Sequence, residues 1–349
     1  MRNHILDIFK LIGIIIVCLL HTAWFPSLYH GYLPVEFFFI VSGYFIYKAS
    51  QKDYGTRLFI GKRIKRLYLP YILALLVFIT LAWFKPNLFN EFNFWPSVLF
   101  STVLLQSPGI PTLFGAEKVI GLCGPAWYLA VLFYGGVFLF ILLRHTNRIF
   151  HITILTLVAI CVYAHMFATG AVEHFHNEGI INLPMFRGIA SMFVGCILAM
   201  PIYRNRISGL VERNSARIIL NVLTIAALMA VAILILTPNR VPVFAVPLYF
   251  IILTGIMTPG LWMNNLNSLT VFSKINIPDI SLEMLLLHKA TIYPSVILCD
   301  KLGMLDNLPV KVIIFLTTTI IASLFLKRVA NKFLNFKWNS IPATINIKR

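Results

Sequence analysis

The sequence predicts an all-α integral membrane protein with about ten transmembrane helices and both termini in the cytoplasm. Three observations lead to this prediction. Of the 349 residues, 59% are hydrophobic and only 12% are charged, about half the charged share of an ordinary soluble protein. Apolar runs close to the ~20 residues needed to cross a bilayer recur along the whole chain. Finally, Lys and Arg residues fall mainly in alternate connections between these runs.

The expected spans are the apolar runs that end at charged residues, Pro or Asn. They make residues 1–349 a single multi-pass membrane domain. The apolar piece from Trp95 to Gln106 is too short to cross, so we expect 85–123 to be a long outer loop containing a short re-entrant or interfacial segment. The expected spans are 5–24, 33–50, 67–84, 124–143, 150–168, 184–203, 216–237, 241–262, 280–300 and 310–327.

The first apolar run, 5–24, superficially resembles a secretory signal peptide. However, Asp7 and Lys10 interrupt the run, and no small-residue cleavage site follows it. We therefore expect a retained first helix.

The formal net charge of +17 would suit a nucleic-acid partner, but the basic residues lie in short connections between apolar spans. We therefore expect the lipid bilayer, and no nucleic acid, as a partner. Basic residues in 48–66, 144–148, 204–217 and 327–349 would face the cytoplasm, whereas 25–32 and 169–183 carry neither Lys nor Arg. The five cysteines lack metal-ligand spacing, so we expect packing residues and no metal.

Ionisable residues within a membrane span are costly, so each is a candidate functional residue. In the first span, Lys10 and His21 are eleven positions apart. On an α-helix they would align within roughly 20° and lie about 16 Å apart along the axis. One face of this helix would thus connect the cytoplasmic edge of the membrane with the outer edge.

The next span begins VEFFFIVSGYF, with Glu36 at a depth similar to that of His21. A carboxylate beside an imidazole can hold its tautomer and raise its basicity, as a general base requires. Alternatively, His21 and Glu36 both lie at the interface and face headgroup water. Gly43 is seven positions after Glu36 and would let another helix or a thin ligand chain approach closely.

The densest positive cluster is RLFIGKRIKRLYLPY, in which Arg63 and Arg66 are three positions apart and share a helix face. Paired guanidinium groups suit multidentate binding of phosphates. The alternative is that this segment is simply the strongest positive-inside signal in the chain.

Two later segments also carry candidates. Trp127 in GPAWYLAVLFY begins a helix at the outer face, where an aromatic belt residue is equally expected. In ISLEMLLLHKA, three ionisable residues lie within seven positions near mid-membrane depth, and we expect them to face an interior cavity. They are Glu283, His288 and Lys289, and Ser281 shares a face with His288.

Taken together, these segments resemble the acyltransferase type 3 family of bacterial membrane enzymes, which transfer acyl groups, usually acetyl, to cell-surface glycans and related acceptors. The resemblance follows motif order over nearly the whole chain. Lys10 and His21 are similar to the family's basic residue and essential histidine, and Arg63 and Arg66 to its Arg-x-x-Arg pair. The other similar segments are VEFFFIVSGYF with Glu36, the stretch from Trp127, MFRGIASMFVGCILA with Arg187, and ISLEMLLLH with Ser281 and His288.

The resemblance implies an O-acetyltransferase of the bacterial cytoplasmic (inner) membrane that uses acetyl-CoA from the cytoplasm. The acceptor would be a hydroxyl group of a cell-surface or exported glycan or glycolipid. His21 and Glu36 would be catalytic, with His21 either removing a proton or accepting the acetyl group. Coenzyme A would bind Lys10, Arg63 and Arg66. Weaker candidates for shaping the pocket or stabilising the oxyanion are Ser42, Gly43, Trp127, Arg187, Ser281 and His288.

Two alternatives stay open. An acyltransferase acting on a lipid or small-molecule acceptor would keep the chemistry and change the substrate. A secondary transporter or flippase would use the buried ionisable residues as an ion pathway. The transporter hypothesis gives no reason for Arg63 and Arg66 to lie beside a Lys10–His21 face.

Overall fold

The structure is a computed structural model that describes residues 3–53, 55–83, 93–106, 111, 121–124, 126–169, 177–178, 181–238, 244–268 and 279–338. This part of the chain is helical apart from a short antiparallel pair of strands, β1 (Asn177–Glu178) and β2 (Ile181–Asn182), and the connecting turns. Each expected span overlaps helical structure. The α-helices are α1 (His4–Leu20), α2 (Pro34–Ser50), α3 (Thr56–Arg63), α4 (Leu69–Trp83), α6 (Phe94–Thr102), α8 (Ala126–Ala130), α9 (Gly136–His145), α10 (Arg148–Thr169), α11 (Leu183–Ala199), α12 (Pro201–Val211), α13 (Asn214–Leu236), α14 (Ala245–Met257), α15 (Trp262–Asn265), α17 (Ser281–Lys301) and α18 (Leu308–Trp338).

Five helices among the described residues are long and apolar enough to cross a membrane. A sixth results if α11 and α12, which meet at a 57° bend, are counted as one broken span. Helices α1 and α2 have 17 residues each, slightly less than a full crossing requires. The expected total of about ten spans and the cytoplasmic termini therefore stay predictions. The five are Thr56–Trp83, Ala126–His145, Asn214–Leu236, Ser281–Lys301 and Leu308–Leu334.

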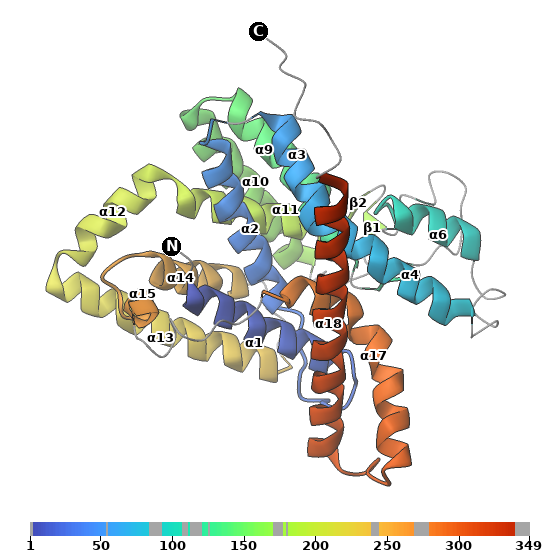
Figure 1. Cartoon of the computed structure of the whole chain (residues 1–349). Helices are drawn as coiled ribbons and strands as arrows, with labels where there is room; N and C mark the ends of the chain where they lie inside the picture. Colours follow the sequence, from blue (N-terminus) through green and yellow to red (C-terminus); the bar gives the residue numbers. More distant parts are fainter. Residues whose placement is uncertain are drawn as a thin grey trace.

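Helix α2 lies in the middle of the molecule, with α11, α9, α1 and α14 packed around it (Figure 1). Most of its residues are buried, because the helix is apolar on all sides. Its three consecutive phenylalanines reach different neighbours. The Phe37 ring centroid is 5.5 Å from that of Tyr249, and the Phe39 centroid is 4.8 Å from that of Tyr128.

The contact between α2 and α11 depends on two glycines. A Cβ atom at Gly43 would overlap the Met192 carbonyl oxygen, and one at Gly195 would overlap the Ile40 carbonyl oxygen. The Cys196 thiol donates a hydrogen bond to the Gly43 carbonyl at 3.2 Å. Small residues that let two backbones touch are typical of membrane helix interfaces. Gly43 was expected to let either another helix or a thin ligand chain approach closely, and the structure shows a helix, α11, at this position.

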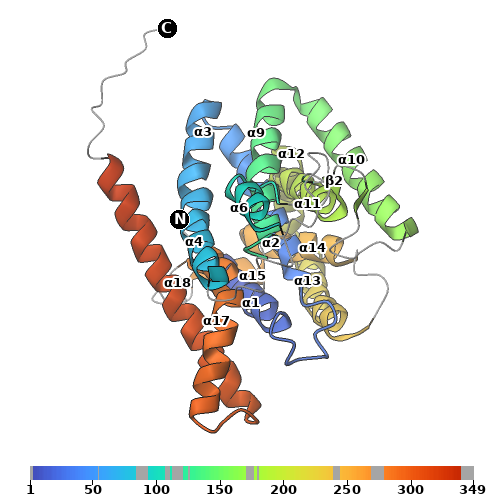
Figure 2. The same cartoon turned by 90° about the vertical axis from the view of Figure 1, so that its right-hand side faces the viewer.

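Helices α17 and α18 form an antiparallel hairpin that extends away from the other helices (Figures 1 and 2). Hydroxyl pairs join them: the hydroxyl oxygens of Thr291 and Thr319 are 2.7 Å apart, as are those of Ser295 and Thr318. Such side-chain hydrogen bonds hold helices together where lipid offers no hydrophobic driving force.

Large apolar side chains are exposed along α13, including Ile218, Val222, Met229 and Ile233. In water such a surface would be an aggregation hazard, whereas in a bilayer it is the ordinary lipid-facing surface. Helix α6 lies within the expected outer loop 85–123; residues 85–92, 107–110 and 112–120 of that loop lie outside the described residues.

Candidate active site

Two histidines from distant parts of the sequence are in contact. His21 follows the last residue of α1, and His288 is fully buried in α17. Their ring centroids are 4.9 Å apart, with 55° between the ring planes. We call these two residues the histidine pair. The fold thus brings His21, the predicted catalytic residue, into contact with His288 of α17, about 270 residues further along the chain.

Backbone carbonyls orient both imidazole rings. Nδ1 of His21 is 2.8 Å from the Val17 carbonyl oxygen, and Nδ1 of His288 is 2.8 Å from that of Leu285. Because a carbonyl oxygen only accepts, Nδ1 carries the proton in each neutral ring, and Nε2 carries the lone pair. Both rings therefore present an unprotonated nitrogen away from their own helices.

Nε2 of His288 is buried and makes no hydrogen bond to any described residue. A buried acceptor without a partner is costly and requires an explanation. In the tautomer that has the proton on Nδ1, this nitrogen can accept a proton or a hydrogen bond but cannot donate one. The expected oxyanion-stabilising role of His288 would therefore require the protonated ring.

Lys289 lies beside the histidine pair; the sequence predicted that it faces an interior cavity but assigned it no role in the site. Its ammonium group interacts electrostatically with His21, and a Cβ added at Gly124 would lie only 2.9 Å from its Nζ. The segment before α8 therefore borders the site. The sequence signal was present, since Lys289 directly follows His288 in an apolar helix.

Glu36 contacts α11 in the structure. Its carboxylate forms an ion pair with Arg187 and accepts a hydrogen bond from the Ser191 hydroxyl. The Tyr163 hydroxyl lies 2.6 Å from the Ser191 hydroxyl and extends this buried network. The predicted pairing of Glu36 with His21 is therefore replaced by pairing with Arg187, whereas His21 contacts Val17 and His288.

The two arginines of the Arg-x-x-Arg pair have different surroundings. A π-helical turn, Ile64–Tyr68, follows Arg63 and changes the regular helical relation between the two side chains. The half-buried Arg63 donates a hydrogen bond to the Leu132 carbonyl and fills the space beside Gly136. Arg66 is exposed. Both guanidinium groups interact electrostatically with the buried Tyr128 hydroxyl.

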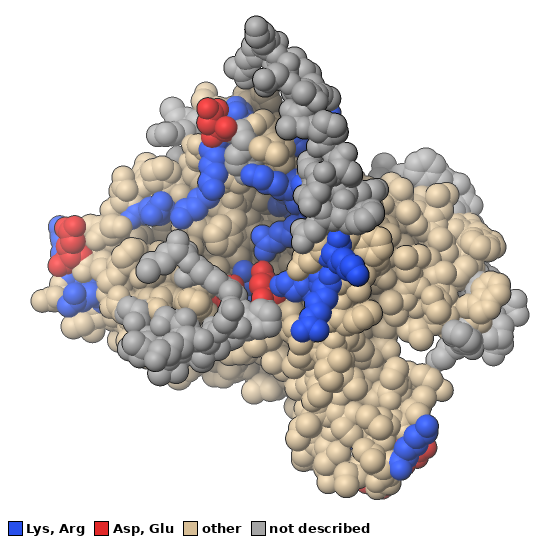
Figure 3. Space-filling model, in the orientation of Figure 1, with Lys and Arg blue, Asp and Glu red and all other residues tan. Residues whose placement is uncertain are grey.

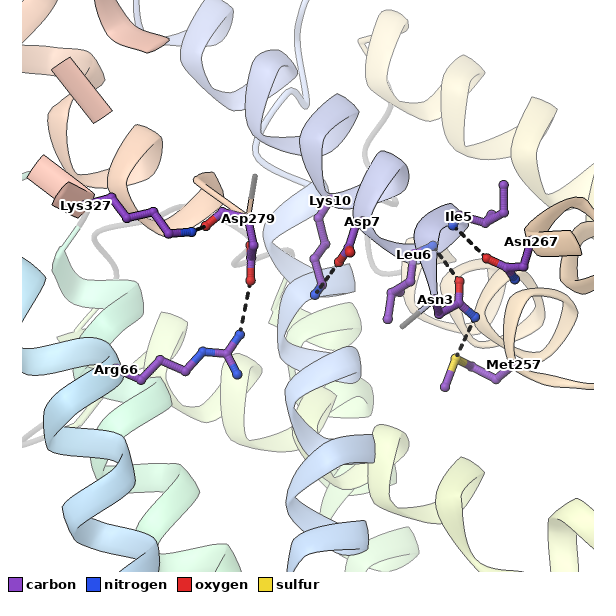
Figure 4. Close-up of polar contacts among 10 residues, drawn as sticks. All are labelled: Asn3, Ile5, Leu6, Asp7, Lys10, Arg66, Met257, Asn267, Asp279 and Lys327. Atoms are coloured by element: carbon purple, nitrogen blue, oxygen red, sulfur yellow. Dashed lines mark hydrogen bonds and ion pairs between the residues drawn. The ribbon is translucent and has the colours of Figure 1, made fainter. Parts of the chain in front are cut away.

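Three cations from helical segments distant in sequence lie on one face of the molecule: Lys10 of α1, Arg66 of the π turn and Lys327 of α18 (Figure 4). We call these three residues the cationic cluster. Nη2 of Arg66 is 3.5 Å from Oδ2 of Asp279, and Lys327 donates a hydrogen bond to the Asp279 backbone carbonyl. Lys10 is paired with Asp7, at 3.6 Å between Nζ and Oδ1. The space-filling view shows blue surface around a small red centre on this face (Figure 3).

Neither Lys327 nor Asp279 was predicted. Lys327 was assigned to the basic tail that indicates orientation, and Asp279 precedes a span without any motif around it. Only the contact of α17 with α18 and their packing beside α4 bring these residues to Arg66.

The remaining candidates have structural surroundings of their own. The Trp127 ring centroid is 6.1 Å from that of Phe39 on α2. Ser42 is half-buried on α2, and Ser281 is half-buried at the start of α17. Gly43 lies in the α2–α11 interface. Among the residues described, no group of three or more His, Cys, Asp or Glu side chains could hold a metal ion.

An open apolar groove of about 550 Å³ lies between α10, α11 and α14. Its walls are almost entirely apolar and include Ala159, Tyr163, Phe167 and Phe244. Neither residue of the histidine pair lines it. It is therefore distinct from the candidate catalytic centre, although Tyr163 connects it to the Glu36 network.

A comparison with known protein families matches residues 3–328 of the chain to a model described as an acyltransferase domain. Comparisons with curated proteins and with solved structures found no match.

Proposed function

Since this chain belongs to the acyltransferase type 3 family, we propose that it transfers an acetyl group from cytoplasmic acetyl-CoA to a hydroxyl group of a cell-surface or exported glycan. Family membership and the apolar helices make the chain a multi-pass membrane acyltransferase. The proposal adds the donor, the acceptor, O-acetylation and a location in the bacterial cytoplasmic membrane.

The contact between His21 and His288 carries the proposal. The Val17 carbonyl holds His21 with the Nε2 lone pair available, which is the form a general base requires. In the proposed reaction, Nε2 of His21 takes the proton of the acceptor hydroxyl. The hydroxyl oxygen of the acceptor attacks the thioester carbonyl carbon at the same time. The carbon–sulfur bond then breaks, and the departing thiolate takes the proton from His21. An ester and free coenzyme A are the products.

Two neighbours would assist this step. Lys289 is close enough to His21 for electrostatic interaction, and in its charged form it would favour the oxyanion that develops on the attacked carbonyl. The His288 ring, whose centroid is 4.9 Å from that of His21, would hold the His21 ring in position during transfer.

The cationic cluster supplies the proposed site for the donor phosphates. Arg66 and Lys10 were expected there, and their charged ends lie on the same face. The Lys10–His21 face of α1 spans about 16 Å, a length that suits an extended pantetheine arm. Arg63 instead supports the site by binding the Leu132 carbonyl in the π turn between α8 and α9, Val131–Gly135.

The test is transfer of radiolabel from acetyl-CoA in membrane vesicles. His21→Ala should lower the rate of incorporation by about 10²–10⁴-fold, the usual contribution of a general base. His145→Ala is the matched control, because His145 is exposed at the end of α9 and should leave the rate unchanged. Wild-type incorporation by well-expressed His21→Ala would refute the assigned role. Absence of incorporation by every protein, with donors and acceptors supplied, would favour transport.

The apolar groove favours a second acceptor class, a lipid or lipid-linked glycan. An open apolar groove of about 550 Å³ between helices of a membrane protein is suited to a hydrocarbon chain. Extracting the vesicles into glycan and lipid fractions in the same assay separates the two acceptors: label in the lipid fraction alone would favour the second.

A further inference from the structure

Each member of the cationic cluster already has a partner in the unliganded protein. The Asp279 carboxylate lies at Arg66, and the Asp279 carbonyl accepts a hydrogen bond from Lys327. Asp279 thus contacts two cations from two different helices (Figure 4). Its own position, directly before Ile280 and α17, links this cluster to the helix that carries His288.

The Arg66–Asp279 ion pair is well placed for exchange. The Arg66 side chain is 73% exposed and that of Asp279 is 41% exposed. Exposed ion pairs contribute little to stability, because water screens them. A guanidinium group binds phosphate in a bidentate fashion and so gains more from a phosphate than from a single carboxylate oxygen at 3.5 Å.

We propose that Asp279 is the resident counter-ion of the phosphate site, that donor phosphates displace its carboxylate from Arg66, and that Lys327 is a third phosphate-binding cation. This inference rests on the proposed function, since it assigns new residues to the donor site. An incoming polyanion therefore meets a negative charge that the protein itself supplies. The cost of displacing that charge lowers donor affinity and makes release of coenzyme A easier.

The inference is tested by titrating coenzyme A into the full-length protein in zwitterionic nanodiscs. Asp279→Asn should bind coenzyme A roughly three- to ten-fold more tightly, because one charge a few ångströms from a phosphate changes binding about five-fold even in water. Lys327→Gln should bind three- to ten-fold more weakly. Asp300→Asn is the matched control: Asp300 is exposed near the other end of α17, and affinity should not change.

The salt dependence of binding provides a second readout. Lys327→Gln should flatten the fall of affinity with rising salt, because one fewer cation is screened. If a thermal melt shows that Asp279→Asn is unfolded, Asp279→Ser replaces it in the binding titration. Pantetheine, which lacks the diphosphate and the 3′-phosphate, should show none of these effects.

The outcomes are distinguishable. Unchanged or weaker binding by both Asp279 variants would overturn the inference, because Asp279 would then orient Arg66 instead of competing for it. Effects seen only in nanodiscs of anionic lipid would assign the cluster to lipid headgroups, which also overturns it. Absence of coenzyme A binding by the wild type would instead remove the donor on which both proposals depend.

Discussion

Glu36 and Arg187 form the most deeply buried ion pair among the described residues, with side chains 2% and 5% exposed. Burying two charges is costly, and mutual pairing with added hydrogen bonds offsets that cost. The Ser191 hydroxyl donates such a hydrogen bond to Glu36, and the Tyr163 hydroxyl in turn hydrogen-bonds with Ser191. The network therefore joins α2, α10 and α11, and its first effect is on stability.

Glu36→Gln should lower the free energy of unfolding by about 3–5 kcal/mol, because it leaves the Arg187 charge buried without its counter-charge. The double variant Glu36→Gln, Arg187→Gln should recover part of that loss. Thermal unfolding in detergent measures both effects. If Glu36→Gln keeps wild-type stability but loses turnover, Glu36 acts in the chemistry, as the sequence predicted.

The histidine pair shows how much of the site could be predicted at the scale of single residues. His21, Lys10, Arg66 and His288 were recognised as ionisable groups within or beside apolar spans, where chance rarely places them. Their partners could not be recognised, because a partner is defined by distance in space. Glu36 appeared close to His21 by depth alone, yet it contacts Arg187 on the opposite helix.

At the scale of helices, the α2–α11 interface depends on the absence of two side chains. Gly43 and Gly195 bring each helix onto the carbonyl oxygens of the other. Because the obstructing atoms are backbone, they cannot rotate away as a flexible side chain could. The same close contact aligns Glu36 with Arg187 and Ser191.

Gly43→Ala should therefore destabilise the protein by about 1–3 kcal/mol or more through overpacking. Gly209→Ala is the control, since Gly209 lies inside α12 with open space around it. There the replacement should be neutral or stabilise by up to about 1 kcal/mol. Thermal melts of the two variants in one detergent compare them directly; equal melting temperatures would contradict the interface described here.

The helix that contains Arg63 and Arg66 is a case in which regular periodicity misleads. A uniform α-helix places residues three apart on one face. The π turn at Ile64–Tyr68 alters this relation, so Arg63 packs beside Gly136 and Arg66 faces Asp279. π turns often occur at functional sites, and their position is not visible in the pattern of apolar residues.

For the whole molecule, the basic connections predict which side of the membrane each turn faces. The exposed turn at Asn147, between α9 and α10, lies beside Arg144 and Arg148 and is predicted to be cytoplasmic. The exposed turn at Asp306, between α17 and α18, is predicted to face outward.

Cysteine labelling tests this orientation. In a Cys161→Ser background, Asp306→Cys should react with a membrane-impermeant maleimide added to intact cells, whereas Asn147→Cys should react only after the membrane is opened. Cys161 is the one exposed cysteine among the described residues, so its removal lowers the background. The opposite labelling pattern would reverse the predicted orientation.

The sequence by itself determined the membrane class, the places where helices occur and the family, and it predicted most ionisable residues of the candidate site. These properties follow from composition, run length and the local order of motifs, all of which are local in the chain. The tertiary structure decided which groups meet: His21 with His288, Glu36 with Arg187, and Arg66 with Asp279. These contacts join residues more than 150 positions apart. Helix packing, set by glycine contacts, a π turn and the α17–α18 hairpin, produces them, and no local pattern encodes that packing.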